Sequence, residues 1–271
     1  MDLKTLQDRP SWEWPEDAGK KLMEILSDEQ ANTSERLFAA ELAGDFVVIS
    51  DALMDALLSI VCNGAESDKL RARAVISMGP ALELAYMDGD DFDYEGISEG
   101  LFKKIQDSLC KLYMDADVSK EVRRRILEAS VRAPQEWHQN AIRAAYFSDD
   151  ESWRLTAVFC MQFVREFEDQ ILEALNSENE DIHYEAVCAA GNWEMDAAWP
   201  HIAALLVSEK TDKELLLAAI EATSNIRPQK AGEVLGGLLD SADEDIVEAA
   251  HEAITMIEMF LDLESNDDEI L

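Results

Sequence analysis

The chain has 271 residues, of which 58 are acidic and 23 basic, so its formal net charge at pH 7 is −35. This balance argues against binding to nucleic acid or to an anionic membrane surface, because both need a basic protein surface. The first residues contain no apolar signal core and no apolar run is long enough to span a membrane, so we expect a soluble cytoplasmic protein.

Residues 1–15 stand before the first expected helix and contain Trp12 and Trp14. We expect this segment to cap the open end of a helical array, because terminal repeats need a cover for their apolar face. A tag that docks onto a partner is the alternative interpretation.

From residue 16 to residue 260, two kinds of amphipathic helix alternate. The first kind carries leucines at helical spacing. The second kind carries an anchor residue and, three positions later, a small side chain such as Ala189 or Ala222, which we expect to let the paired helix approach closely. The anchors are Ala40, Ala74, Ile126, Ala157, Ala186, Ala219 and Ala250. We predict antiparallel helix pairs over residues 16–44, 49–85, 97–131, 135–164, 168–192, 196–225 and 229–260.

The spacing of the anchors indicates repeats. The last five anchors are 31, 29, 33 and 31 residues apart, and a period of this length is typical of a stacked-repeat solenoid. The step from Ala74 to Ile126 is 52 residues, so an acidic insertion near residues 86–96 interrupts the array. After the last pair, we expect residues 261–271 to form an acidic tail, disordered from Glu264 onward.

The helix pairs resemble the HEAT-repeat family, and most closely the short bacterial repeats of this family that phycobilin lyases share. Glu121-Val122-Arg123 and Ser152-Trp153-Arg154 match the Val-Arg step of the family. In the last three repeats the arginine is replaced by His183, Leu216 and Val247. The resemblance covers residues 16–260 and implies an all-α fold, a right-handed α-α superhelix of about seven antiparallel helix pairs.

The acidic insertion contains part of a calcium-loop pattern. Phe102 stands where such a loop has its closing carboxylate, so a solvated acidic loop is the expected state and weak calcium binding is the alternative. The residues that follow the order of calcium ligands are Asp91, Asp93, Glu95 and Glu99.

The sequence lacks zinc-ligand spacing, a phosphate-binding glycine loop and a nucleophile elbow. His251-Glu252 resembles one unit of the di-iron hydroxylases built from HEAT repeats, but those enzymes use several such pairs and no other histidine here precedes a glutamate. We therefore expect no enzymatic activity, no cofactor and no metal centre. The four cysteines lie in apolar stretches, so we expect buried thiols in a reducing compartment.

The resemblance implies that the anchored helices line a concave face. Positions two before and two after each anchor should point away from the packed stripe, and in the middle repeats several of them are aromatic. Nine of the twelve arginines lie between residues 71 and 165, and arginine and aromatic side chains are enriched in binding hot spots. The candidate partner-binding residues are Arg124, Leu155, Phe159, Phe163 and Tyr184.

These residues predict a monomeric scaffold that binds a protein or peptide in its concave groove, with arginines suited to an acidic or carboxylate-bearing segment. In the alternative interpretation, the aromatic side chains are core between repeats and the arginines pair with neighbouring acids. The alternative function is a lyase or chaperone-like protein that holds a small apolar or tetrapyrrole-like ligand.

Overall fold

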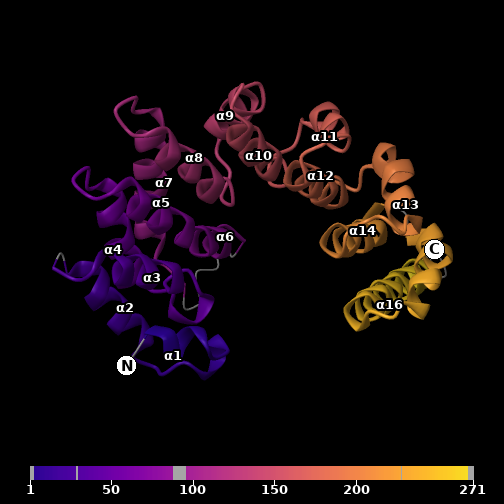
Figure 1. The fold of residues 1–271 in the computed structure, drawn as a ribbon, viewed down its shortest axis with the longest axis horizontal. Helices are drawn as coiled ribbons and strands as arrows, with labels where there is room; N and C mark the ends of the chain where they lie inside the picture. Colours follow the sequence, from indigo (N-terminus) through magenta and orange to yellow (C-terminus); the bar gives the residue numbers. More distant parts are fainter. Residues whose placement is uncertain (1–2, 29, 88–95, 227, 268–271) are drawn as a thin grey trace. The chain divides into compact units, whose positions relative to one another are not determined.

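The computed structural model describes residues 3–28, 30–87, 96–226 and 228–267, without the side chains of residues 228–230 and 260–267. Within these ranges the regular structure is helical and contains no strand (Figure 1), so the all-α prediction is confirmed. The chain divides into two compact units, residues 1–144 and 145–271. Among the helices described, none is both long and apolar enough to cross a membrane.

The first unit consists of short helices stacked pair upon pair. Each second helix of a pair also packs on the second helix of the next pair, as α3 does on α5 and α5 on α8. The helices are α1 (Leu3–Gln7), α2 (Ala18–Ser27), α3 (Thr33–Leu42), α4 (Asp51–Cys62), α5 (Asp68–Ser77), α6 (Gly79–Met87), α7 (Glu99–Met114), α8 (Lys120–Ser130) and α9 (Glu136–Tyr146), and α9 ends in the second unit.

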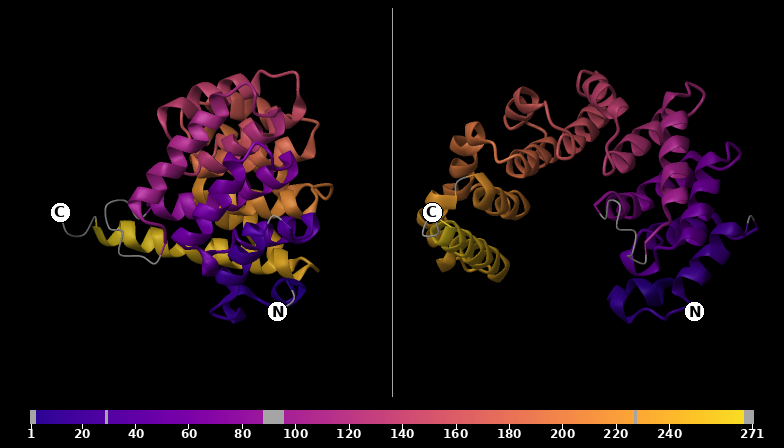
Figure 2. Two further views of the ribbon diagram at one scale, coloured as in Figure 1. Left: turned by 90° about the vertical axis from the view of Figure 1, so that its left-hand side faces the viewer. Right: turned by 180° about the vertical axis from the view of Figure 1, so that it is seen from behind.

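The second unit repeats this arrangement, with α12 packed on α14 and α14 on α16. Figure 2 shows the same succession from behind. The helices are α10 (Glu151–Cys160), α11 (Glu168–Ala174), α12 (Glu180–Asn192), α13 (Trp199–Val207), α14 (Lys213–Ile226), α15 (Pro228–Leu235) and α16 (Glu244–Asp267). Across both units, helices therefore occur at each position predicted from the apolar periodicity.

Polar side chains fix where the second helices begin. The side chain just before each helix accepts a hydrogen bond from a backbone N–H of the first turn, which has no partner inside the helix. Ser67, for example, accepts from the N–H of Leu70 at 3.3 Å, and Asn179 accepts from that of Ile182 at 3.1 Å. The same contact is made by Asn32, Ser119, Asp150 and Asp212.

Arginines of the second helices tie the two helices of a pair together. Arg36 is buried and donates to the carbonyl oxygen of Leu26 at 3.0 Å and to both carboxylate oxygens of Glu66. Arg71 repeats the contact with the carbonyl of Val61 at 2.9 Å. The last carbonyls of a helix lack partners within it, so these guanidinium groups satisfy acceptors that would otherwise be buried and unpaired.

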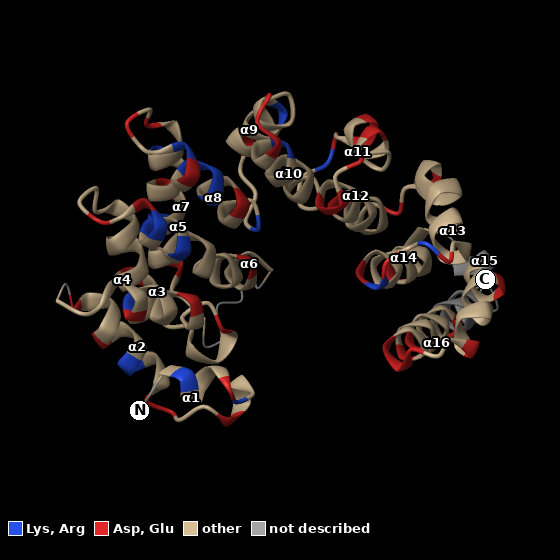
Figure 3. Ribbon diagram, in the orientation of Figure 1, with Lys and Arg blue, Asp and Glu red and all other residues tan. Residues whose placement is uncertain are grey.

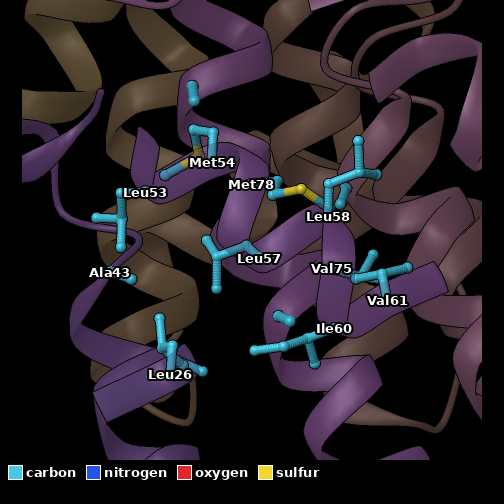
Figure 4. Close-up of a cluster of buried hydrophobic side chains, with 14 of the residues drawn as sticks. Leu26, Ala43, Leu53, Met54, Leu57, Leu58, Ile60, Val61, Val75 and Met78 are labelled. Carbon is cyan, nitrogen blue, oxygen red and sulfur yellow. The ribbon is translucent and has the colours of Figure 1, made fainter. Parts of the chain in front are cut away.

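The core of the first unit is a continuous cluster of aliphatic side chains from successive helices (Figure 4). Leu57 of α4 and Val75 of α5 are fully buried within it. The cluster also includes Leu3 and Leu6 of α1, in the segment expected to act as a cap. Trp14 donates from its indole nitrogen to the carbonyl of Leu6 at 2.9 Å, whereas Trp12 is 79% exposed.

Small residues let neighbouring second helices approach closely. A Cβ atom added at Gly191 of α12 would lie 2.8 Å from the Cα of Ala222 on α14. One added at Gly44, just after α3, would lie 3.1 Å from the Cα of Ser77 on α5. These close contacts are made with the next repeat, whereas the sequence-based expectation for the small residues was packing within a pair.

Two boundaries differ from those predicted. The second helix of the pair expected over residues 49–85 is split at Met78, because Pro80 has no N–H to continue the hydrogen-bond ladder of α5 into α6. At the other end, α16 continues to Asp267, so the part of the expected disordered tail up to that residue is helical. Residues 268–271 lie outside the described residues.

Candidate functional site

An open groove of about 910 Å³ runs over α12, α14 and α16 in the second unit. Each helix contributes one stripe of side chains at intervals of three or four residues, the spacing of a single helix face. On α14 the stripe is Glu214, Leu217, Ala218, Glu221 and Ser224; on α16 it is Ala249, Glu252, Ala253 and Met256; on α12 it is Glu180, Asp181, Tyr184 and Glu185.

The floor of the groove is apolar. Leu215, Ala218 and Ala253 line it and are themselves buried. Two larger apolar side chains stand exposed within it, because Tyr184 keeps 38% and Met256 keeps 54% of their surface in contact with solvent. Exposed apolar side chains gathered in a concave surface are typical of a binding site.

The walls of the groove are acidic. Seven of the sixteen lining residues are Asp or Glu, and none is Lys or Arg. The neighbouring Lys213 is held by Asp243, at 2.8 Å, and by Asp245. Figure 3 shows α16 with red segments and no blue ones, in agreement with its sequence, which has no Lys or Arg. The groove therefore presents apolar surface between carboxylates, with no Lys or Arg among its lining residues.

The pKa values of Tyr184 and Cys188 on α12 are raised mainly by burial and by the thiol beside the tyrosine, with smaller contributions from nearby carboxylates. The adjacent Cys188 thiol, burial and the carboxylates of Glu185 and Glu221 raise the pKa of Tyr184 to about 12. Burial and the carboxylate of Glu185 raise the pKa of Cys188 to about 11. Both groups are therefore neutral at physiological pH, and Cys188 is a poor nucleophile because the thiol does not ionise there.

Of the five residues predicted to form one partner-binding surface, Tyr184 alone lines this groove. Tyr184 lines the groove, but Leu155, Phe159 and Phe163 are not among the lining residues. They are half-buried, and the rings of Phe159 and Phe163 lie 5.4 Å apart.

Arg124 belongs to the first unit and keeps 9% exposure, with ion pairs to Glu121 at 3.0 Å and to Glu128 at 3.8 Å. The expectation that Arg124 is a partly exposed anchor is wrong, because its guanidinium pairs with acids one turn away on the same helix.

Two further arginines of the first unit, Arg73 and Arg125, pair with neighbouring acids, as the alternative interpretation predicts. A second groove, of about 570 Å³, lies over α3, α5 and α8 and is lined by both signs of charge. Arg73 lies 3.9 Å from Glu41 across this groove, and Arg125 pairs with Glu121 at 3.1 Å. The lining apolar residues Leu37, Phe38 and Ile76 are only half-exposed. Arg73 and Arg125 are thus charge-compensated.

Sequence reasoning missed most of the groove, although the signal was present. Positions two before or two after an anchor also line the groove in the last two repeats. For the anchor Ala219 the same rule gives Leu217 and Glu221, and for Ala250 it gives Glu252 as one of its two positions; all three line the groove. Met256 lies one turn further along α16 than Glu252.

Of the possible metal ligands named from the sequence, the structure describes only some. Among the described residues, no three His, Cys, Asp or Glu side chains are placed to hold a metal ion together. Asp91, Asp93 and Glu95 of the calcium-loop pattern lie outside the described residues, and Glu99 begins α7 and pairs with Lys103. The expectation that all four thiols are buried holds for Cys160 alone, because Cys110 and Cys188 are half-buried and Cys62 is exposed at the end of α4.

His183 occupies a position where the repeat pattern has arginine, and it makes a different contact. Its Nε2 atom lies 2.7 Å from the Nε2 of His201 on α13. Burial lowers the pKa of both histidines, and for His201 the neighbouring His183 lowers it further. One neutral ring therefore donates to the other, and this hydrogen bond replaces the arginine-to-carbonyl contact of the earlier repeats.

Comparison with known proteins agrees with the repeat architecture. Residues 168–255 match the family model for HEAT repeats. Two solved structures are similar over most of the chain. YibA from Escherichia coli is 19% identical, with 93% of this chain and 85% of that chain covered and a TM-score of 0.48. Human deoxyhypusine hydroxylase, solved in complex with glycerol, is 18% identical, with 95% and 88% covered and a TM-score of 0.40.

No curated protein matches the sequence significantly. The family match spans α11 to α15 and the first half of α16, which include the three helices of the acidic groove. The segment from residue 168 to residue 255 is therefore composed of HEAT repeats, as the resemblance implied.

Proposed function

We propose that the chain is a HEAT-repeat scaffold that binds a segment of another protein in the groove over α12, α14 and α16. The observation that carries this proposal is the pairing of exposed Tyr184 and Met256 with an open groove of about 910 Å³. Protein segments that dock on helical surfaces bury a row of apolar anchors between helices, and aromatic residues contribute much of the binding energy.

The alternative, a small apolar or tetrapyrrole-like ligand, fits this groove less well. Small-molecule sites are concave and predominantly apolar, and they enclose most of the ligand surface. This groove is open, and carboxylates make up seven of its sixteen lining residues. A visible absorbance band in protein purified from its native host would favour the alternative.

Photo-crosslinking from within the groove tests the proposal. A photoreactive side chain at position 256 should capture a partner protein that mass spectrometry identifies. Met259 offers a matched control, because it lies on the same helix and is 62% exposed but does not line the groove. Crosslinks to one protein from position 256 and not from 259 support the proposal, and equal crosslinking from both positions contradicts it.

The contribution of the apolar anchors is tested by substitution. Tyr184→Ala combined with Met256→Ala should abolish binding of the crosslinked partner. Phe147→Ala combined with Met259→Ala is the control, because Phe147 is 67% exposed and also lies outside the groove. Equal loss of binding in both double variants would show that exposed apolar surface in general, and not the groove, attracts the partner.

A further inference from the structure

We infer that the occupant of this groove is a basic amphipathic segment, in which Lys or Arg side chains flank an apolar stripe. The inference rests on the proposed function and specifies the chemistry of the partner. It departs from the sequence-based expectation of an acidic peptide, which depended on Arg124.

The lining of the groove is negatively charged. Its walls hold seven carboxylates with no lining cation, and the nearby Lys213 is already paired with Asp243 and Asp245. An acidic segment would bring like charges into a concave surface, where repulsion is costly. A basic segment would find an exposed carboxylate on each of the three helices, at Asp181, Glu221 and Glu252.

The apolar surface of the groove extends over all three helices. Tyr184 on α12 and Met256 on α16 stand on the outer helices of the groove, and Leu217 and Ala218 lie on α14 between them. A polybasic segment without apolar residues would leave Tyr184 and Met256 exposed. A segment with one apolar face and basic edges matches both features at once, because apolar residues at helical spacing form one stripe.

The net charge of the whole chain does not by itself select a partner. A formal charge of −35 attracts any cation over long distances, and this steering raises association rates without selecting a partner. Selection must come from the groove, where carboxylates and apolar side chains occur together. A test must therefore distinguish groove carboxylates from those elsewhere on the same unit.

The experiment measures the binding of three fluorescent peptides of about 18 residues, a length that supports a helix, to the full-length protein by anisotropy. The first peptide carries Lys and Leu in an amphipathic helical pattern. The second has Glu in place of each Lys. The third has the composition of the first in an order that destroys the apolar stripe. We expect the first peptide to bind most tightly, and we expect its binding to weaken with added salt, which screens the carboxylates.

Two charge-reversal variants locate the binding. Glu221→Lys with Glu252→Lys changes the groove, and Glu178→Lys with Glu209→Lys makes the same charge change at exposed positions of the second unit outside it. We expect the groove variant to weaken binding of the basic amphipathic peptide at least about tenfold, and the control variant less than about threefold. Circular dichroism checks that each variant remains folded.

The remaining outcomes separate the two proposals. Equal weakening by both charge-reversal variants, or equal binding of the scrambled basic peptide, overturns the inference of a basic amphipathic partner. If the acidic peptide binds as well as the basic one and Tyr184→Ala with Met256→Ala abolishes that binding, the groove function stands and the inference fails. If no peptide binds, or if binding is insensitive to Tyr184→Ala with Met256→Ala, both fail.

Discussion

Replacing Gly191 by alanine probes the contact on which the stacking of the second unit depends. A Cβ atom at this position would lie 2.8 Å from the Cα and 2.9 Å from the Cβ of Ala222. Carbon atoms in contact are ordinarily about 3.5–4.0 Å apart. Because one of the obstructing atoms belongs to the backbone of α14, no change of side-chain rotamer relieves the clash, and α12 and α14 must move apart.

Two effects oppose each other in Gly191→Ala. Alanine in a helix is more favourable than glycine by up to about 1 kcal/mol. Overpacking a closely packed contact costs about 1–3 kcal/mol. Gly191 is the penultimate residue of α12, where the gain in helix propensity is smallest, so overpacking dominates. We expect a net loss of about 1–2 kcal/mol in the free energy of unfolding.

Chemical denaturation followed by circular dichroism measures this change. Gly232→Ala is the matched control, because Gly232 lies within α15 and an added Cβ would meet no atom within 4 Å. The control should gain about 0.5–1 kcal/mol from helix propensity alone. If Gly191→Ala is as stable as the natural protein or gains as much as the control, α12 and α14 do not approach each other as described.

Three further predictions follow from the packing and the buried polar groups. Ala222→Leu, on the other side of the same contact, should lower the denaturation midpoint, with a cost of about 1–3 kcal/mol; an unchanged midpoint would contradict the close approach to Gly191. Arg36→Ala should lower the free energy of unfolding by about 3 kcal/mol, because it leaves the half-buried Glu66 and the carbonyl of Leu26 without their donor. Thermal or chemical unfolding measures this loss, and a change under about 0.5 kcal/mol would show that water replaces the guanidinium. Burial lowers the pKa of His138 to about 4, so the unfolded chain binds a proton that the folded chain does not. Above about pH 6.5 His138 is neutral in both states and does not affect the free energy of unfolding. As the pH falls below about 6.5, protonation of the unfolded chain lowers the free energy of unfolding, by about 2 kcal/mol at pH 5. His138→Gln should remove this part of the pH dependence, and an identical pH profile in the variant would refute the assignment.

The helices were predictable because the local sequence determines them. Apolar residues at helical spacing gave their positions. Their starts were readable from capping side chains such as Ser67 and Asn179, although the predicted ranges did not depend on them. The break at Met78 was also readable from Pro80, which was not used. The extension of α16 to Asp267 was not readable from periodicity, because its last residues are mostly polar.

The candidate site was predictable only in part, because burial depends on neighbours. Tyr184 was found by its position relative to the anchor Ala186, and the same rule would have found Glu221 and Glu252. The error at Arg124 was avoidable, since Glu121 and Glu128 stand one turn before and after it. The groove itself could not be predicted from single helices, because it forms only where α12, α14 and α16 stack on one another.

Hydrogen–deuterium exchange of the full-length protein, with and without the partner captured from position 256, tests the central claim most directly. The account predicts slower exchange in α12, α14 and α16 on binding, with α2, α4 and α7 unchanged. Protection confined to helices of the first unit, or absent from α14, would contradict the assignment of the groove as the binding surface.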